Sequence, residues 1–382
     1  MKKIAIIGSG EFQLPLIRLA KMQGIETHVF SWGGNELIGD YFYKISITEK
    51  KTILDKCKII GIDGICSIGS DLANITVNYI ADHLGLVGNS LECTEYTTNK
   101  YRMRQRLVKN KIPVPHFTFL NNIQSVSIPV YPVIVKPVDR SGSRGISLVD
   151  SVNDLSTAIK LAFEESFSKE ILIEEFVTGR EFSVESISFN GVHEILQITE
   201  KFTTGSPDFI ERGHTCPARI TAGERSLIND LVYRTLVAVN MSNGAAHTEL
   251  KINENGDAYI IEIGSRMGGD YIGSDLVLHS TGFDFTKAVL AISMGEFFNL
   301  NDYYLEKLNS RVSIVKFIFN ENDLNRSRRL FDDNFINVVH SNLMSSSFDS
   351  EIKIASSADR LGHILITANL NRQNEILQAL GF

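Results

Sequence analysis

Ala246–Ile263 reads AHTELKINENGDAYIIEI, in which two alternating, strand-like runs surround Asn255-Gly256. An Asn-Gly pair between such runs is the strongest short-range signal of a β-hairpin. With a two-residue turn at these positions, Glu249 lies directly opposite Glu262. Facing residues have Cβ atoms about 4.5–5.5 Å apart, and like charges there destabilise the sheet unless a cation lies between them. The hairpin therefore predicts a Mg²⁺ site, because Mg²⁺ usually takes one or two protein carboxylates together with substrate phosphate oxygens.

The residues that flank this hairpin favour a functional site over a solvated hairpin with two surface glutamates. His247 lies two residues before Glu249 and therefore on the same face of the strand. Arg266 follows Glu262 by four residues, inside the Gly-rich segment GSRMGG at 264–269. The opposite face is expected to pack against the core through Leu250, Ile252, Tyr259 and Ile261.

The composition predicts a soluble protein of two or three domains. A chain of 382 residues is too long for one typical core, and its 43% hydrophobic and 22% charged residues are ordinary values. The net charge of −7, without a long Lys/Arg run, argues against a nucleic-acid partner. The four cysteines show no CxxC spacing, which favours the reducing cytoplasm. We expect no membrane span, since no stretch approaches the roughly 20 apolar residues that one needs.

Three regions differ in their pattern along the chain. Residues 1–95 alternate strands with helices, as in a parallel sheet covered by helices. A basic helix over Thr98–Asn110 opens the second region, which continues to about residue 300, and the last eighty residues predict a small α+β lobe. The expected strands are Lys3–Ile7, Thr27–Phe30, Gly64–Ile68, Leu86–Gly88, Val133–Lys136, Ile171–Phe176, Phe182–Phe189, Arg311–Phe319, Ile336–His340, Ile352–Ala355 and Gly362–Ala368.

A loop of small residues follows the strand that carries Lys136. Asp139–Gly145 reads DRSGSRG, and its Gly and Ser residues leave backbone N–H groups free to wrap anionic oxygens. A lysine on a strand beside such a loop is similar to the kinase arrangement, in which a flexible loop covers the nucleotide phosphates. We therefore favour phosphate binding over an ordinary surface turn. Lys100, on the basic helix, is a weaker candidate for the same role.

Two further segments place polar groups at strand ends. Glu174–Val177 reads EEFV and is followed by Glu181; such an edge can hold a purine through backbone groups and a ribose through a carboxylate. The segment 211–218 reads ERGHTCPA. A nucleophilic pair of Cys216 and His214 is disfavoured there, because catalytic Cys-His pairs usually come from distant parts of a sequence. A substrate-contacting loop around His214 is the preferred interpretation.

The N-terminal Gly8-Ser9-Gly10 lies between a strand and a helix, the context of a dinucleotide-binding fingerprint. However, Gln13 occupies the third glycine position, and the next strand ends without an acid for a ribose hydroxyl. A tight turn that helps to build the sheet is favoured. A nicotinamide-dependent oxidoreductase stays as an alternative with little support.

Taken in order, these motifs resemble the ATP-grasp superfamily. The set comprises a Lys on a basic helix, VKP at 135–137, the small-residue loop, EEFV at 174–177, Glu181, HTE at 247–249 and E-x-x-x-R at 262–266. It is most similar to the carboxylate–amine ligases, with the carbamoyl-phosphate synthase large subunit and the L-amino-acid ligases as relatives, and it spans about residues 1–300. The resemblance implies an ATP-grasp fold of mixed α/β and α+β class. Its expected parts are a Rossmann-like pre-ATP-grasp domain over 1–96, an ATP-grasp core over 97–300 with a lid subdomain over about 113–178, and a C-terminal α+β lobe over 301–382.

The resemblance also implies roles for individual residues, with ATP and Mg²⁺ (or Mn²⁺) as cofactors. Glu249 and Glu262 would bridge the metal, and a homodimer is expected from the relatives. The catalytic candidates are Arg266, Lys136 and His214, and the substrate candidates are His214, His247, Arg266 and Gly268. The expected ATP contacts are Lys100, Lys136, Ser141, Gly142, Ser143, Glu174, Glu175, Phe176, Val177, Glu181 and Ile261.

Gly264 departs from the family pattern E-x-N-x-R, in which the Asn adds a metal contact. Glycine offers no side-chain oxygen, so a water or Ser265 would have to substitute, and the number of metal ions stays open. We interpret the chain as an ATP-dependent ligase that activates a substrate carboxylate as an acyl phosphate and joins it to an amine. A bicarbonate-dependent, carboxyphosphate-forming enzyme and a non-catalytic nucleotide sensor are the alternatives.

Overall fold

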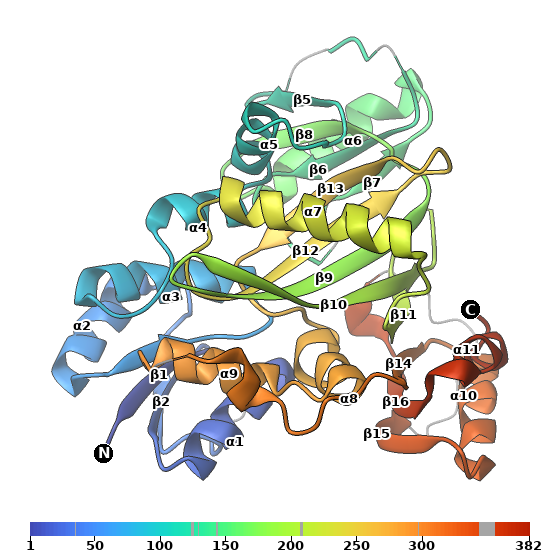
Figure 1. The fold of residues 1–382 in the computed structure, drawn as a ribbon. Helices are drawn as coiled ribbons and strands as arrows, with labels where there is room; N and C mark the ends of the chain where they lie inside the picture. Colours follow the sequence, from blue (N-terminus) through green and yellow to red (C-terminus); the bar gives the residue numbers. More distant parts are fainter. Residues whose placement is uncertain are drawn as a thin grey trace.

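The computed structural model describes residues 1–34, 36–123, 126–128, 130–142, 144–206, 209–296, 298–343 and 356–382. Its strands form one eight-stranded sheet and two four-stranded sheets. The eight-stranded sheet runs through the middle of the molecule, one small sheet lies above it, and the other lies below at the N-terminal end (Figure 1). The expected strand Ile352–Ala355 lies outside the described residues.

The N-terminal sheet is parallel, as predicted, in the order β3-β2-β1-β4. Its strand β3 was not predicted, because it is a short, exposed edge strand of aromatic residues. The expected strand Leu86–Gly88 is wrong: this segment follows the left-handed Gly85 that ends a helix, and it joins no sheet. The elements are β1 (Lys3–Ile7), α1 (Leu14–Met22), β2 (Glu26–Ser31), β3 (Tyr41–Lys44), α2 (Lys50–Ile60), β4 (Gly64–Cys66) and α3 (Asp71–Leu84).

The Gly8 turn is closed by the side chain of Gln13. Its amide donates to the carbonyl of Ile68 and accepts from the Ile68 N–H, while its Cγ lies 3.3 Å from the position of a Cβ on Gly8. Glutamine therefore fills the space above the turn and ties it to the loop after β4. This arrangement supports the interpretation of a turn that builds the sheet.

The upper sheet is antiparallel, with the order β5-β8-β6-β7. Helix α6 covers it through Leu155, Ile159 and Ala162, which recur at helical spacing and are buried. Helix α5 begins at Lys100, where the Asn99 side chain accepts from the backbone N–H of Arg102 and so caps the helix. The elements are α4 (Leu91–Thr98), α5 (Lys100–Lys109), β5 (Phe117–Leu120), β6 (Val133–Pro137), β7 (Ser147–Val149), α6 (Val152–Glu165) and β8 (Ile171–Glu175).

The central sheet is antiparallel, with the order β13-β12-β9-β10-β11-β14-β16-β15. Strands β9 and β10 join at a two-residue turn in which Asn190 and Gly191 have positive φ, as a type I′ turn requires. Helix α7, which starts with a capping box of Thr221 and Glu224, packs on one face. The elements are β9 (Arg180–Phe189), β10 (Val192–Thr203), β11 (Glu211–Cys216), α7 (Ala222–Ala238), β12 (Gly244–Ile252) and β13 (Ala258–Gly264).

The C-terminal strands continue this central sheet rather than forming one of their own (Figure 1). Strand β14 pairs with β11, so backbone hydrogen bonds connect the two sides of residue 300. The domain boundaries at residues 96 and 300 stay predictions. The C-terminal elements are β14 (Arg311–Ile318), α10 (Glu321–Arg328), β15 (Asn337–Leu343), β16 (Gly362–Asn369) and α11 (Gln373–Leu380).

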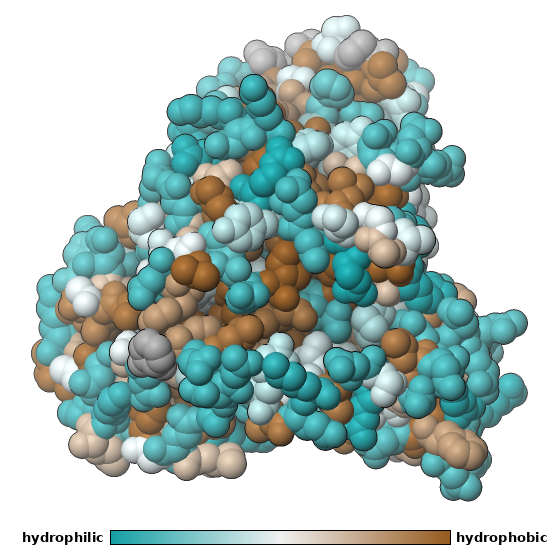
Figure 2. Space-filling model, in the orientation of Figure 1, coloured by the Kyte–Doolittle hydropathy of each residue, from teal (hydrophilic) through white to brown (hydrophobic). Residues whose placement is uncertain are grey.

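After β13 the chain returns to the N-terminal sheet. Helices α8 (Val277–Thr281) and α9 (Phe285–Ser293) follow, and α9 shares a core cluster with Ile4 and Ile6 of β1. This packing joins the N-terminal sheet to the central sheet. On the face in Figure 2, hydrophobic side chains gather in the middle, and most of the rim is hydrophilic. No helix in the described ranges combines the length and apolar character that a membrane crossing demands.

Candidate functional site

The hairpin of β12 and β13 brings Glu249 and Glu262 opposite each other, although its turn and its register differ from the prediction. The predicted two-residue turn is wrong: Ile252 pairs with Ala258, so the loop is longer, and Gly256 (φ +84°) takes its left-handed position. A β-bulge after Glu249 then shifts the register by one residue. The two offsets cancel, and the predicted pairing of the two glutamates is confirmed.

The bulge also changes which side chains face the core. Leu250 and Ile252 are buried as expected, but Ile260 is fully buried in place of Tyr259 and Ile261. Ile261, expected in the core, instead lines the same cavity as Glu262. Neighbouring residues of one strand normally point to opposite faces, so the bulge explains how both reach the cavity.

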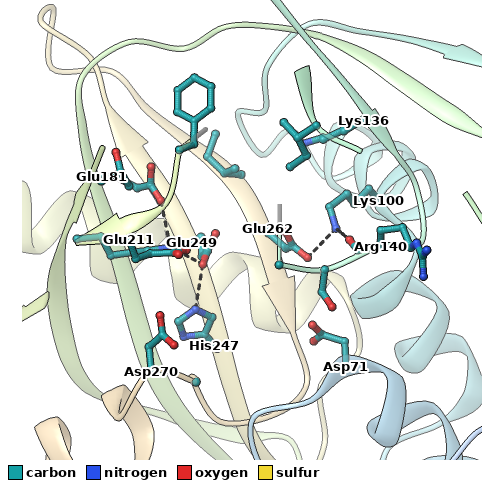
Figure 3. A pocket seen from close by; sticks show the side chains of 18 of the residues that line it. Asp71, Lys100, Lys136, Arg140, Glu181, Glu211, His247, Glu249, Glu262 and Asp270 are labelled. Carbon is teal, nitrogen blue, oxygen red and sulfur yellow. Dashed lines mark hydrogen bonds and ion pairs between the residues drawn. The ribbon is translucent and has the colours of Figure 1, made fainter. Parts of the chain in front are cut away.

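The two glutamates face a cavity of about 430 Å³ whose walls come from the upper sheet, the central sheet and the N-terminal domain (Figure 3). Gly269 rather than Gly268 lies on its wall, and Ser143 lies outside the described residues. The predicted site residues on its wall are Lys100, Lys136, Ser141, Gly142, Glu174, Glu175, Phe176, Val177, Glu181, His214, His247, Glu249, Ile261, Glu262 and Arg266.

Lys100 connects the hairpin to the small-residue loop. Its ammonium donates to Glu262 Oε1 at 2.9 Å and to the carbonyl of Arg140 at 2.8 Å, and the residue is only 5% exposed. In Figure 3 these three groups meet on one side of the cavity. A buried ammonium next to this small-residue loop offers positive charge to an anionic ligand.

Glu174 lies in a buried ion-pair cluster. Its carboxylate accepts from Arg104 at 2.7 and 3.1 Å and from Lys136 Nζ at 2.6 Å. Burial alone would raise the pKa of Glu174, but Arg104 and Lys136 outweigh it and lower that pKa to about 2. Arg104 also donates to the Ile261 carbonyl at 2.8 Å. The carboxylate of Glu174 is thus engaged by protein cations, and its role toward a nucleotide stays a prediction.

Lys201 was not predicted as a site residue from the sequence, although its ammonium pairs with carboxylates on the other side of the cavity. Its ammonium lies 2.6 Å from Glu249, 3.1 Å from Glu181 and 4.0 Å from Glu211, and its side chain is 4% exposed. Each hairpin glutamate is therefore paired with a lysine, Glu249 with Lys201 and Glu262 with Lys100. The expected uncompensated repulsion between the two acids is wrong for this structure.

These pairs fit a cation site of a particular kind. Within the described ranges, no three His, Cys, Asp or Glu side chains group closely enough to hold a metal by themselves. Two facing carboxylates would supply only part of the shell of Mg²⁺ or Mn²⁺, which takes its other oxygens from phosphate and water and would compete with the two lysines. Glu249 and Glu262 would hold such an ion.

His247 is held between two carboxylates. Its Nδ1 pairs with Glu185, and its Nε2 lies 3.2 Å from Glu249 Oε1. Burial would lower the pKa of His247, but Glu185 and Glu249 outweigh it and raise that pKa to about 9. Glu185 also accepts from the Gly268 N–H at 2.9 Å, so this predicted substrate contact already has a protein partner.

Arg266 forms an ion pair with Asp71, the first residue of α3 in the N-terminal domain. Its Nε and Nη2 donate to the two Asp71 oxygens at 2.7 and 3.0 Å, a bidentate pair. A Cβ on Gly264 would lie 2.7 Å from Asp71 Oδ1 and 3.2 Å from Arg266 Nε. The glycine thus leaves the room that this ion pair occupies, and Asp71 puts a carboxylate where the family pattern has an Asn side chain.

His214 lies at the far end of the cavity, beside Asp270. It is 1% exposed, and within the described part of the chain neither ring nitrogen has a hydrogen-bond partner. Asp270 lies 3.6 Å from its Nε2 and accepts from Arg360 of the C-terminal lobe at 2.8 and 2.7 Å. Burial lowers the pKa of His214 despite Asp270. A neutral imidazole can both donate and accept toward a bound molecule.

Comparisons with known proteins concern the family and the fold of the chain. A family model described as "ATP-grasp domain" matches residues 129–275. A D-alanine–D-alanine ligase of Hydrogenovibrio crunogenus is 24% identical over 56% of this chain and 71% of its own length. The uncharacterized protein y4rH of Sinorhizobium fredii is 28% identical over 65% of this chain and 51% of its own, so the chain spans about half of that relative.

Among solved structures, an L-amino acid ligase from Bacillus licheniformis superposes with a TM-score of 0.83, at 22% identity, over 100% of this chain and 97% of that one. At this identity the likeness concerns the fold. Together with the domain match it confirms the expected ATP-grasp fold and the resemblance to the ATP-grasp superfamily. The chain carries an ATP-grasp domain.

Proposed function

We propose that this protein is an ATP-dependent carboxylate–amine ligase. The observation that carries the proposal is the facing pair Glu249 and Glu262, which lines one cavity together with Lys100, Lys136 and Arg266. The ATP-grasp match supports nucleotide binding in this cavity, between the upper sheet and the central sheet. The D-alanine–D-alanine ligases among the relatives support amide-bond formation.

The proposed reaction has two steps. An oxygen of the substrate carboxylate attacks the γ-phosphorus of ATP, the bond from that phosphorus to the β,γ-bridging oxygen breaks, and ADP leaves. The amine nitrogen then attacks the acyl carbon, the bond from that carbon to the phosphate oxygen breaks, inorganic phosphate leaves with the electron pair, and the nitrogen loses a proton. A Mg²⁺ ion bound at Glu249 and Glu262 would supply charge neutralisation for the phosphates.

The protein side chains have positioning and electrostatic roles in this scheme. Lys100 and Lys136 hold the phosphates, and Arg266, fixed by Asp71, presents its guanidinium to the charge that passes through the acyl phosphate. The loop with Ser141 and Gly142 covers the phosphates and limits access of water to the acyl phosphate. His214 and His247 contact or orient substrate.

The first experiment measures ADP release from Mg-ATP by the purified protein. Pools of amino acids and other small carboxylates are supplied with and without added amines, and bicarbonate is a separate arm. Release of ADP and phosphate that depends on a carboxylate and an amine is expected. Release with bicarbonate alone would favour the carboxyphosphate reaction, and ATP binding without any turnover would favour a nucleotide sensor.

Two finer expectations are part of this proposal. A homodimer is expected from the family resemblance, and size-exclusion chromatography with light scattering would test it. A cytoplasmic location is supported by four cysteines that are all free and buried.

A further inference from the structure

A second cavity, of about 310 Å³, opens on the phosphate side of the nucleotide cavity. Both cavities are lined by the same small group of residues, so they share a wall: Asp71, Lys100, Arg140, Ser141 and Glu262. The second cavity extends toward Trp32, which follows β2, and toward Phe167, which follows α6. We call it the Trp32 cavity. A molecule in it would lie next to the groups assigned to phosphate and metal.

The outer part of the Trp32 cavity is apolar. Trp32 follows β2 and is 57% exposed, and Phe167 follows α6 and is 63% exposed. Leu72 and Ile75 stand three residues apart on α3, and therefore on one helix face. Large apolar side chains from two domains that converge on one hollow provide burial for an apolar ligand group.

One cationic residue of the shared wall, Arg140, borders this apolar part. The guanidinium of Arg140 stacks on the Phe167 ring at 4.0 Å, and its Nη2 donates to Glu165 at 2.9 Å. Its Nε is buried and lacks a hydrogen-bond partner among the described residues. The exposed Arg144 lines the same cavity. An unpartnered, buried donor on a cation is a favourable contact for a carboxylate of a ligand.

The three acids that line this cavity, Asp71, Asp139 and Glu262, have different roles. Asp139 accepts from the N–H groups of Phe167 and Ser168 and from the Ser166 hydroxyl, so it maintains the shape of the cavity. Asp71 and Glu262 lie on the shared wall, where Asp71 binds Arg266 and Glu262 binds Lys100. The cavity thus presents an apolar region, three cationic side chains (Lys100, Arg140 and Arg144) and the two paired acids.

We propose that the Trp32 cavity binds the amine substrate, and that this substrate carries a phenyl- or isobutyl-sized apolar group and a carboxylate. The apolar group lies against Trp32 and Ile75, the carboxylate contacts Arg140, and the amino group points to the shared wall. The proposal rests on the ligase function proposed above. It leaves the part of the main cavity around His214 for the other substrate.

Trp32 is the only tryptophan of the chain, so its fluorescence reports on this cavity without any need for turnover. The probes are L-phenylalanine, L-leucine and 2-phenylethylamine, which lacks the carboxylate, each titrated into the protein with Mg-ADP present. A saturable change in emission is expected with both amino acids, with affinity for 2-phenylethylamine at least tenfold weaker. No saturable change with either amino acid overturns the proposal, and equal affinity for 2-phenylethylamine overturns the role of Arg140.

Variants separate a direct contact from a distant effect. Ile75→Ala should weaken the fluorescence-detected affinity for L-phenylalanine about tenfold, and Arg140→Gln should weaken it while sparing 2-phenylethylamine. Met22→Ala changes an exposed apolar residue of the same domain outside the cavity, and it should leave the affinity unchanged. Unchanged affinity in Ile75→Ala, with folding intact by circular dichroism, contradicts the site.

Kinetics link the cavity to the reaction. For the amine that is turned over, Trp32→Ala should raise its KM about tenfold and leave the KM for ATP within twofold. A rise in both values would assign Trp32 to the fold rather than to the amine. If no amine supports ADP release, the ligase function fails, while the fluorescence titration still decides whether the Trp32 cavity binds these molecules.

Discussion

Lys201 and the carboxylates around it determine what a single substitution does at the metal site. If the facing acids repelled each other, removing either charge would stabilise the fold. In the structure, however, Glu249 neutralises Lys201, whose side chain is 4% exposed. The pKa of Lys201 is raised, since Glu249, Glu181 and Glu211 outweigh its burial, which shows how closely the ammonium depends on these partners.

We predict that Glu249→Gln abolishes ADP release and lowers the free energy of unfolding by about 1–3 kcal/mol, because a buried ammonium loses a charged partner. Glu262→Gln should also abolish release. Urea unfolding and the ADP assay measure the two effects. Glu254→Gln, in the exposed loop of the same hairpin, is the matched control and should change neither. A more stable Glu249→Gln protein would contradict the lysine pairing.

Gly264 and Asp71 form a second test at this scale, since a Cβ on the glycine would come within 2.7 Å of the carboxylate. We predict that Gly264→Asn lowers kcat at least tenfold, because Asp71 must release Arg266. In an Asp71→Ala background the same substitution should cost far less. A double-mutant cycle on kcat, with the KM for ATP and the melting temperature beside it, measures this coupling. Additive effects would mean that the two sites act independently.

Helix α5 connects the upper sheet to the central sheet through one buried arginine. Arg104 is fully buried, holds Glu174 of β8 and donates to the Ile261 carbonyl of β13. Lys136 of β6 completes the cluster. Both walls of the nucleotide cavity are therefore tied to the same helix, near the end where the adenine is expected.

This cluster makes stability depend on pH in a predictable direction. The folded-state pKa of Glu174 is about 2, against an ordinary value of 4.5, so its contribution is complete above about pH 4.5 and is lost as the pH falls toward 2. We predict that wild type exceeds Glu174→Gln by about 3 kcal/mol at pH 7. Urea unfolding of both proteins from pH 7 to 2.5 should show the gap narrowing; a constant gap would contradict the ion-pair assignment.

The elements also show what could be read from the sequence. Apolar–polar alternation and the Asn255-Gly256 pair predicted most strands of the described chain. The predicted pairing of Glu249 with Glu262 was correct. The bulge that moved Ile261 into the cavity has no sequence signal, because it depends on how β12 meets its neighbours. By contrast, Asn190-Gly191 was a readable hairpin signal that was missed. Counting back from it pairs Glu181 with residue 200, one bulge away from Lys201.

Asp71, Asp270 and Arg360 were beyond prediction for a different reason. Asp71 and Arg360 reach the site from the N-terminal domain and the C-terminal lobe, which are distant from the hairpin in sequence, and Asp270 comes from the segment after β13. The packing of α9 on β1 and the pairing of β14 with β11 help to bring them together. One sequence contains no periodicity that encodes such contacts.

At the scale of the whole molecule, nucleotide binding should draw the upper sheet and the central sheet together. We predict that Mg-ATP at about 100 times its Kd stabilises the protein by about 2.7 kcal/mol. Tryptic cleavage after the exposed Arg144 should slow in parallel. Differential scanning fluorimetry and mass spectrometry of the digest measure both effects. Mg-ATP that raises the melting temperature but leaves cleavage at Arg144 unchanged would place the nucleotide away from this loop.

The continuity of the central sheet has a consequence for how this chain tolerates shortening. Strand β11 is mostly buried, and its outer backbone groups pair with β14 from the C-terminal lobe. A chain cut near residue 300 would leave these backbone groups unpaired on a new edge strand, which is a template for adding strands from other molecules. The last eighty residues would then have two roles. They cover the edge of β11 and so prevent aggregation through it, and they supply Arg360 to the site.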